Sequence, residues 1–407
     1  MRIKIKFSIT IISLLLPLML SAQRKQINIA QDQIKNGKDL AKAEKSMRQL
    51  LDDSVNHRNI KIWMTLFKAM QKQYEQGNEK LYLKQKYDTA SLFDVTKRLF
   101  VDMECFDSIC RIPDKKGRID NKYSEKHAEY LNAIRPNLFY GGAFMVNKQR
   151  FQDAFDFYSL YLECAGKSMF QTYNYLEKDT MMPQVAYWAS YCGYRLHNVA
   201  MTQQYKQLAL RDTLHLSRAI QQLAEAALWE KDTVEYVELL EKGFGCFPKN
   251  PFFFSRLTDF WQGKERYDSA MAVVNRAYAA DSTNMLFRYA KSSILLNTGH
   301  YDECIDICKK LIEEDDSLSD AYYNIGLAYF NQAIQLDKEE QKYRKKRRRI
   351  VELYELSLPF FERYRLLAPD EKRKWISPLY TIYLNLNKGK EFDEIDRIRH
   401  EYRRNHP

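Results

Sequence analysis

The chain has 407 residues, of which 45% are apolar, 29% are charged and 14% are aromatic, and its formal net charge is +11. Its 13 glycines and 10 prolines are about half the share of average proteins, which excludes collagen, β-barrels, β-propellers and low-complexity chains. The 28 tyrosines and 22 phenylalanines can bury a large core, so plain disorder is excluded as well. Composition therefore predicts a helix-rich, aromatic protein.

Residues 1–22 have the architecture of a secretory signal peptide. Three basic residues precede an apolar stretch from Phe7 to Leu20, and the small residues Ser21 and Ala22 follow it. The apolar stretch is shorter than the roughly 20 residues that a membrane-spanning helix needs, and no other segment approaches that length. We therefore expect the mature chain to carry no transmembrane segment and to be exported to the periplasm or cell envelope, or secreted.

The region 23–118 is predicted to be helical from the spacing of its apolar residues. Ala43, Met47 and Leu50, for example, would share one helical face. At its end, Pro113–Gly117 combines a helix breaker, charged residues and a glycine, a composition typical of a linker. We therefore expect an N-terminal helical region of degenerate repeats that ends near residue 118.

From residue 217 onward the sequence repeats itself with a period of 34. Small residues recur at this spacing at one position, and mostly large apolar residues recur at another. The small set is Ala224, Thr258, Ser292 and Gly326, and the second set is Ala227, Trp261, Leu295 and Tyr329. Because helix backbones approach closely only where side chains are short, this pattern predicts a helix crossing in every repeat, with aromatic rings beside it.

Each repeat is predicted to be a helix hairpin, for example Phe252–Trp261 followed by Tyr267–Ala279, with Gly263 in the turn. The order of large, medium and small residues along these helices resembles the tetratricopeptide repeat. The residues that carry the resemblance are Phe254, Leu257 and Thr258, then Tyr267, Ala270 and Ala277, and in a later copy Tyr322, Ile325, Gly326 and Tyr329. The resemblance implies an all-α fold, a right-handed superhelical solenoid of antiparallel helix hairpins whose first helices line a concave, protein-binding face.

The repeat also divides the rest of the chain. The clear array covers 217–369 and contains a basic helical insertion near 331–350, because a later copy follows after 53 residues instead of 34. The stretch 119–216 matches the repeat less closely and is predicted to contain an insertion near 168–183. Residues 370–407 are expected to form capping helices.

No catalytic or cofactor-binding motif is found in the sequence. The seven histidines are scattered without metal-ligand spacing, and there is no nucleophile elbow, phosphate-binding loop or dinucleotide fingerprint. The seven cysteines show neither a disulfide framework nor a redox motif, and buried free thiols explain them best. The sequence therefore predicts a protein that is not an enzyme and that holds no metal or cofactor, and an enzyme with an unrecognised site is a distant third alternative.

A strongly basic run lies inside the predicted insertion near 331–350. It consists of Lys342, Arg344, Lys345, Lys346, Arg347, Arg348 and Arg349. One interpretation is a solvated helical extension, and the other is docking to an anionic surface such as a glycan, a lipid headgroup or an acidic protein face. Nucleic acid is not expected, because the chain is predicted to be exported and no aromatic ladder interleaves the run.

The resemblance also predicts which residues the concave face would present to a partner. These are Trp229, Phe252, Asp259, Tyr289, Asn297, Tyr323 and Phe330. Aromatic side chains with interspersed polar groups suit an extended peptide or a partner helix, whereas the alternative is that several of them pack against neighbouring hairpins. The leading hypothesis is an exported, non-catalytic scaffold or adaptor that binds proteins through this groove, and the rival is an anionic-surface binder that docks through 342–349.

Overall fold

The computed structural model describes residues 22–113, 116–119, 122–338 and 344–405, and every regular element within these ranges is helical. The predicted all-α fold is therefore confirmed. The chain divides into two compact units, one that ends at Thr233 and one that begins at Val234. Apart from Ala22, the predicted signal peptide lies outside the described residues. Within the described ranges, no helix is both long and apolar enough to cross a membrane.

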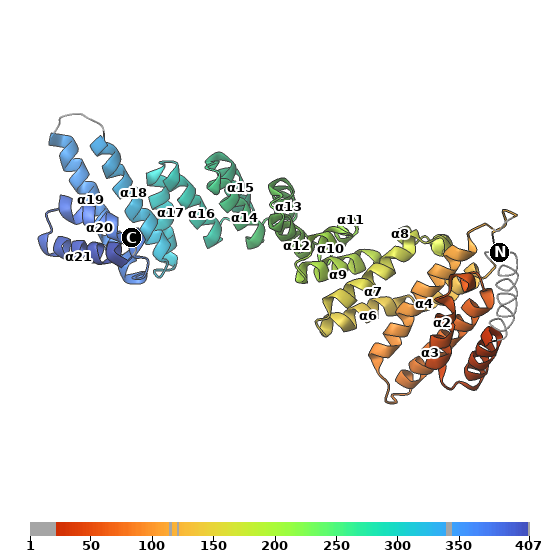
Figure 1. Cartoon of the computed structure of the whole chain (residues 1–407). Coiled ribbons are helices and arrows are strands. Elements are labelled where there is room, and N and C mark those ends of the chain that lie inside the picture. The colour runs from red at the N-terminus through yellow and green to blue at the C-terminus, as the bar shows by residue number, and fades with distance from the viewer. Residues whose placement is uncertain (1–21, 114–115, 120–121, 339–343, 406–407) are drawn as a thin grey trace, which may run out of the picture. The chain divides into compact units, whose positions relative to one another are not determined.

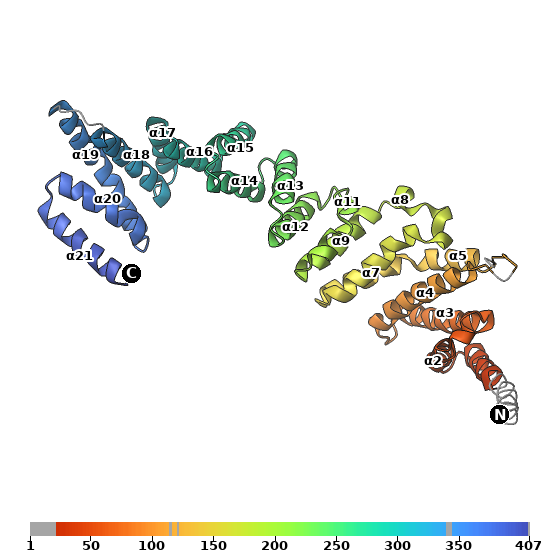
Figure 2. The same cartoon turned by 45° about the horizontal axis from the view of Figure 1, so that its top comes forward.

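The first unit begins with a helical segment over residues 22–36 and continues as a series of helices (Figure 1). These are α2 (Leu40–Leu51), α3 (Ile60–Tyr82), α4 (Thr89–Cys110), α5 (Ser124–Ile134), α6 (Pro136–Asn147), α7 (Phe151–Glu163), α8 (Tyr175–Lys178), α9 (Met182–Arg195), α10 (Val199–Gln203), α11 (Lys206–Ala209) and α12 (Leu216–Trp229). Helix α3 packs on both α2 and α4, and α7 packs on both α6 and α9, so neighbours in the chain are neighbours in space (Figure 2).

Local sequence explains where these helices begin and which face they bury. The side chain of Asn59 accepts a hydrogen bond from the backbone N–H of Lys61 and caps α3, and Pro136 occupies the first turn of α6. In α6 the buried Gly142 allows a close approach, because a Cβ there would lie 2.6 Å from Cζ of Tyr158. Packing thus explains this glycine.

The first unit contains a buried arginine that holds an irregular segment in place. Between α7 and α9, residues 164–181 form two 3-10 turns and the short helix α8. The guanidinium carbon of Arg135 lies 3.6 Å from the ring centroid of Tyr161 and 3.8 Å from that of Tyr175. Arg135 also donates a 2.6 Å hydrogen bond to Asp179. These contacts compensate the buried charge and attach the segment to the core.

The second unit is a series of helix hairpins followed by two terminal helices. Its helices are α13 (Thr233–Cys246), α14 (Pro251–Gly263), α15 (Tyr267–Ala280), α16 (Met285–Asn297), α17 (Tyr301–Glu314), α18 (Ser319–Lys338), α19 (Arg344–Leu367), α20 (Lys372–Asn385) and α21 (Gly389–Asn405). Consecutive helices from α14 to α21 pack on one another, and Figures 1 and 2 show α14 to α18 in chain order.

The helix starts reproduce the period of the sequence. The first helices α14, α16 and α18 begin at Pro251, Met285 and Ser319, each 34 residues after the one before. The second helices α15 and α17 begin at Tyr267 and Tyr301, again 34 residues apart. The predicted repeat of antiparallel helix hairpins is confirmed by this spacing.

The hairpin of α18 and α19 differs from the others because both of its helices are long. Helix α18 has 20 residues and α19 has 24, whereas α14 to α17 have 13 or 14 each. The extra residues therefore extend the two helices of one hairpin at the place where the basic insertion near 331–350 is predicted. The predicted domain boundaries themselves stay predictions.

Candidate functional site

In the second unit, the first helices of three successive hairpins bring a charged pair and two tyrosines together. Tyr289 lies on α16, Asp320 and Tyr323 on α18, and Lys374 on α20. Nζ of Lys374 lies 3.7 Å from Oδ1 of Asp320 and 5.8 Å from the ring centroid of Tyr323. The same two charged groups also act electrostatically on Tyr289. Residues from three successive hairpins thus form one surface, which we call the α16–α18–α20 surface.

A pocket of about 310 Å³ opens on this surface between α16 and the start of α18. Its apolar wall includes Met285, Leu286 and Leu311, and Tyr289 and Asp320 lie at its polar side. The floor includes Ala321, which occupies the position that holds a buried phenylalanine in the two preceding repeats, Phe253 and Phe287. The space exists because the ring at this position of the repeat is replaced by a methyl group.

Both tyrosines of the surface keep their protons over the physiological range. Burial is the largest cause that raises the pKa of the Tyr289 hydroxyl, and burial likewise raises the pKa of Tyr323. Each therefore presents a neutral hydroxyl, which can donate and accept hydrogen bonds, on an apolar ring. Half-buried tyrosines of this kind combine a large apolar contact area with a polar end, a combination enriched at protein interfaces.

Of the predicted groove residues, Tyr289 and Tyr323 both lie near the Asp320–Lys374 pair. Tyr323 also serves the core, because its ring lies 5.1 Å from that of Tyr364. Phe330 lies 5.8 Å from the ring of Tyr354 in α19 and packs against the core between the two long helices. The packing alternative that the sequence left open thus accounts for the position of Phe330.

The other predicted groove residues lie on neighbouring helices. Phe252 packs edge-to-face on Phe253, with 5.4 Å between ring centroids, and remains half-buried at the start of α14. Asp259 and Asn297 are exposed on α14 and α16. These three residues do not line the pocket between α16 and α18.

Trp229 belongs to the first unit and has partners of its own there. Its ring stacks on Tyr194, with centroids 5.3 Å apart and planes 17° apart, and lies 4.7 Å from the ring of His197. The hydroxyl of Tyr194 donates a hydrogen bond to the Glu225 carboxylate, which orients the stack. About a third of Trp229 is exposed.

Sequence reasoning missed Asp320 and Lys374. Asp320 occurs at the position of the repeat that holds Phe252 and Leu286 in the two preceding hairpins, so a charge at an otherwise apolar position was the available signal. Lys374 lies in the segment predicted to cap the array, and only the packing of α20 beyond α19 reveals that it reaches α18.

The described part of the basic run forms the exposed start of α19. Lys342 lies outside the described residues, and side chains are described from Lys346 onward. Nε of Arg348 lies 3.1 Å from Oε1 of Glu352, and Nη1 of Arg349 lies 3.4 Å from the other oxygen of the same carboxylate. Arg347 is exposed beside them. The Glu352 carboxylate thus pairs with two arginines on this helix end.

Within the described ranges there is no group of three or more His, Cys, Asp or Glu side chains that could hold a metal ion. The expected burial of the cysteines is found for Cys164, Cys192, Cys304 and Cys308, whereas it is wrong for Cys105 and Cys246, which are exposed. Cys304 and Cys308 lie one turn apart in α17 and pack with the surrounding core.

No family model and no curated protein matches this chain. Solved structures do match. Tetratricopeptide-repeat proteins are among them. The 34-residue spacing of the helix starts in this chain agrees with the predicted resemblance to the tetratricopeptide repeat.

Three of these structures show the range of similarity. YrrB, described as a tetratricopeptide-repeat protein with an unusual peptide-binding site, is 17% identical over 49% of this chain and 93% of its own, with a TM-score of 0.35. The C-terminal part of a repeat-containing protein from Cytophaga hutchinsonii is 11% identical over 63% and 92%, with a TM-score of 0.43. MamA from Desulfovibrio magneticus RS-1 is 16% identical over 47% and 96%, with a TM-score of 0.36.

Proposed function

We propose that the chain is an exported, non-catalytic tetratricopeptide-type scaffold that binds a protein partner through the α16–α18–α20 surface. The observation that carries this proposal is the apolar pocket beside Tyr289, flanked by the Asp320–Lys374 pair. A rigid array of hairpins presents such a surface without reorganisation, so little conformational entropy is lost when a partner binds.

An extended peptide segment suits this surface best. The pocket volume of about 310 Å³ lies at the lower end of the range for ligand pockets and suits one or two apolar side chains. Asp320 can accept hydrogen bonds from main-chain N–H groups, and Lys374 can donate to main-chain carbonyl groups. We expect Tyr289 to be the main anchor, because truncation of a central interface tyrosine commonly costs about 2 kcal/mol or more of binding free energy.

Export is the second part of the proposal and is supported by residues 1–22. A basic start, an apolar stretch and small residues before a polar segment are the features of a secretory signal. Cleavage after residue 22 in a native host, measured by N-terminal sequencing of the protein from the envelope fraction, tests it. A chain that retains its first residues in the cytoplasm would contradict it.

The partner surface is tested by site-specific photo-crosslinking in intact cells. A photo-reactive residue at Leu286, on the pocket rim, is expected to capture a discrete partner, and the same residue at Tyr82, exposed in the first unit, serves as the matched position. Tyr289→Ala should lower the Leu286 crosslink at least tenfold, whereas Tyr82→Ala should leave it unchanged. Equal capture at both positions, or no effect of Tyr289→Ala in a folded variant, would contradict the proposal.

The rival function, docking to an anionic surface, depends on the exposed arginines at the start of α19. Arg348 and Arg349 share Glu352, and the side chain of Arg348 is 85% exposed. Joint replacement of Arg347, Arg348 and Arg349 by glutamine would then abolish sedimentation with anionic vesicles, and binding would fall steeply with salt. Turnover of a substrate by the purified chain would instead support the third alternative, an enzyme.

A further inference from the structure

The core of the second unit contains two thiols on one face of a helix. Cys304 and Cys308 lie one turn apart in α17, and both are fully buried. The preceding repeat carries Ala270 and Val274 at the same positions, 34 residues earlier, and these two residues are fully buried as well. Small apolar side chains therefore satisfy the packing at these positions, so packing alone does not account for two sulfur atoms.

A disulfide bond does not explain the pair either. Side chains one helical turn apart have Cβ atoms about 5–6 Å apart, whereas a disulfide needs a separation of about 3.5–4.5 Å. The bond could form only if α17 unwound, yet this helix is continuous from Tyr301 to Glu314. Cys304 and Cys308 are therefore both thiols, and the helix keeps them so even in an oxidising compartment.

Polar side chains from two neighbouring helices lie beside the sulfur of Cys308. Asn324 on α18 and Ser292 on α16 are both buried, and Nδ2 of Asn324 lies 3.3 Å from Oγ of Ser292. The hydrogen bond with Cys304 is the largest cause that lowers the pKa of Cys308, against the effect of burial. Hydrogen bonds with Ser292 and Asn324 lower it further. The core thus offers donors to a negative charge on this sulfur.

The thiol pair lies close to an open pocket. Leu311 follows Cys308 by three positions on the same face of α17 and lines the pocket of about 310 Å³ between α16 and α18. Tyr289, which also lines this pocket, is near enough to Cys308 for the two groups to interact electrostatically. A small ion that enters the pocket therefore has about one helical turn left to cross before it reaches the sulfur atoms.

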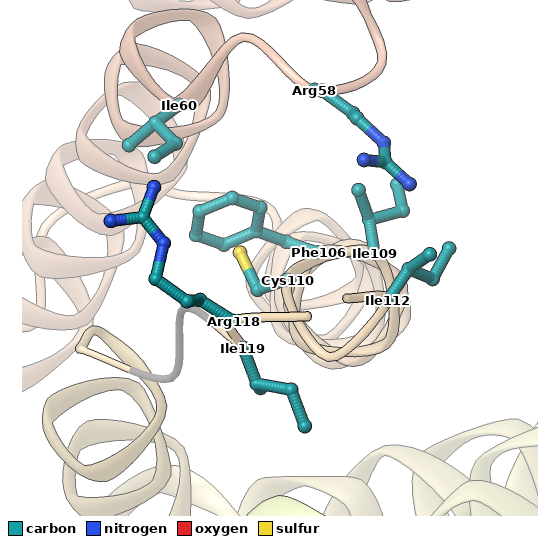
Figure 3. Close-up of a pocket in the computed structure, with 8 residues that line it drawn as sticks. All are labelled: Arg58, Ile60, Phe106, Ile109, Cys110, Ile112, Arg118 and Ile119. Atoms are coloured by element: carbon teal, nitrogen blue, oxygen red, sulfur yellow. The ribbon is translucent and has the colours of Figure 1, made fainter. Parts of the chain in front are cut away.

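A pocket of the first unit shows the contrast. It has a volume of about 420 Å³ and lies between the start of α3 and the end of α4. Figure 3 shows that Cys110 carries the only sulfur atom among its eight labelled lining residues, and that Arg58 and Arg118 lie on opposite sides of the space. This pocket offers one thiol and no second sulfur ligand beside it.

We propose that Cys304 and Cys308 bind one Cu(I) ion. Thiolates are soft ligands that select Cu(I), and two sulfur ligands on opposite sides of the ion are sufficient for it. Two metal–sulfur bonds of about 2.3 Å each span the distance between side chains one turn apart, so the helix stays intact. Binding releases both thiol protons and leaves one net negative charge, which Ser292 and Asn324 can stabilise.

Zn(II) fits the pair less well. A structural zinc site needs four protein ligands, and within the part of the chain that the structure describes no group of three or more His, Cys, Asp or Glu side chains could hold a metal ion. The two-sulfur arrangement in α17 therefore favours the ion that two thiolates can satisfy.

Anaerobic titration of the full chain with Cu(I), in competition with the chromophoric chelator bathocuproine disulfonate, tests the proposal. One Cu(I) ion per chain is expected to leave the chelator, and X-ray absorption at the copper edge should show two sulfur ligands. The apparent affinity should rise with pH, because binding releases thiol protons. Zn(II), offered in the same way with a zinc chelator, should stay with the chelator.

A variant that copies the preceding repeat locates the ion. Cys304→Ala combined with Cys308→Val gives these positions the residues that Ala270 and Val274 provide in the neighbouring hairpin, so the fold should persist. Circular dichroism at 222 nm checks the fold of this double variant. Because both sulfur ligands are gone, it should leave Cu(I) with the chelator.

Two further variants separate the site from the other thiols. Cys110→Ser removes the single thiol of the pocket in Figure 3 and should leave Cu(I) uptake unchanged. Asn324→Ala, which copies Ala290 of the preceding repeat, should weaken Cu(I) binding about 10–100-fold, because the thiolate loses a nearby donor. Uptake of Cu(I) by the folded double variant, loss of uptake in Cys110→Ser, or no uptake by the unchanged chain would each overturn the proposal.

Discussion

Two glycines of α13 provide a test of the way in which the hairpins pack. Gly243 is buried, and a Cβ at this position would lie 2.5 Å from both Cδ1 and Cζ of the fully buried Phe253. Gly245 lies in the same helix, and a Cβ there would meet nothing within 4 Å. Neither glycine adopts a positive φ. The two positions therefore differ mainly in the space around the added methyl group.

The expected magnitudes follow from this difference. Replacing glycine by alanine inside a helix stabilises by up to about 1 kcal/mol through backbone entropy. At Gly243 the displaced ring of Phe253 costs about 1–3 kcal/mol of overpacking. Gly245→Ala should therefore raise the free energy of unfolding by up to about 1 kcal/mol, and Gly243→Ala should be about 1–3 kcal/mol less stable than Gly245→Ala.

Urea unfolding followed by circular dichroism at 222 nm measures both variants, and hydrogen exchange in α13 and α14 shows whether the loss is local. Phe253→Leu should relieve the clash, so the double variant with Gly243→Ala should be more stable than the sum of the single effects predicts. Equal stability of Gly243→Ala and Gly245→Ala would refute the reasoning that the Phe253 ring of α14 packs directly on Gly243 of α13.

The remaining predictions concern buried ionisable groups of the first unit. Burial lowers the pKa of His127 to about 4, so the folded protein favours the neutral imidazole. The contribution of His127 to the free energy of unfolding is fully present above the unfolded pKa near 6.5 and is lost as the pH falls toward 4. The free energy of unfolding, measured by thermal unfolding, should therefore fall by about 1.5 kcal/mol between pH 6.5 and pH 5. His127→Phe should remove this part of the pH dependence. Arg135→Ala leaves Asp179 without its buried partner and should cost about 3–5 kcal/mol in chemical denaturation. Arg150→Ala, which removes an exposed pair, should cost less than about 1 kcal/mol, and similar losses for both arginines would contradict the buried role of Arg135.

The sequence alone determined the helical hairpin and its period. Helix formation depends on residues three and four positions apart, and the spacing of small and aromatic residues repeats every 34 positions. Both signals can be read locally, and the helix starts at Pro251, Met285 and Ser319 agree with them. The signal peptide is likewise a local pattern and remains a prediction.

The tertiary structure alone decided which aromatic residues of the repeats stay at the surface and which pack in the core. Tyr323 and Phe330 lie on the same helix seven positions apart, yet only the packing of α19 shows that Phe330 lies against the core. The contact of Lys374 with Asp320 joins residues 54 positions apart, and the pocket at Ala321 depends on what α16 and α17 place around it. Such features arise between helices, where the distance along the chain carries no information about the distance in space, so no local periodicity can encode them.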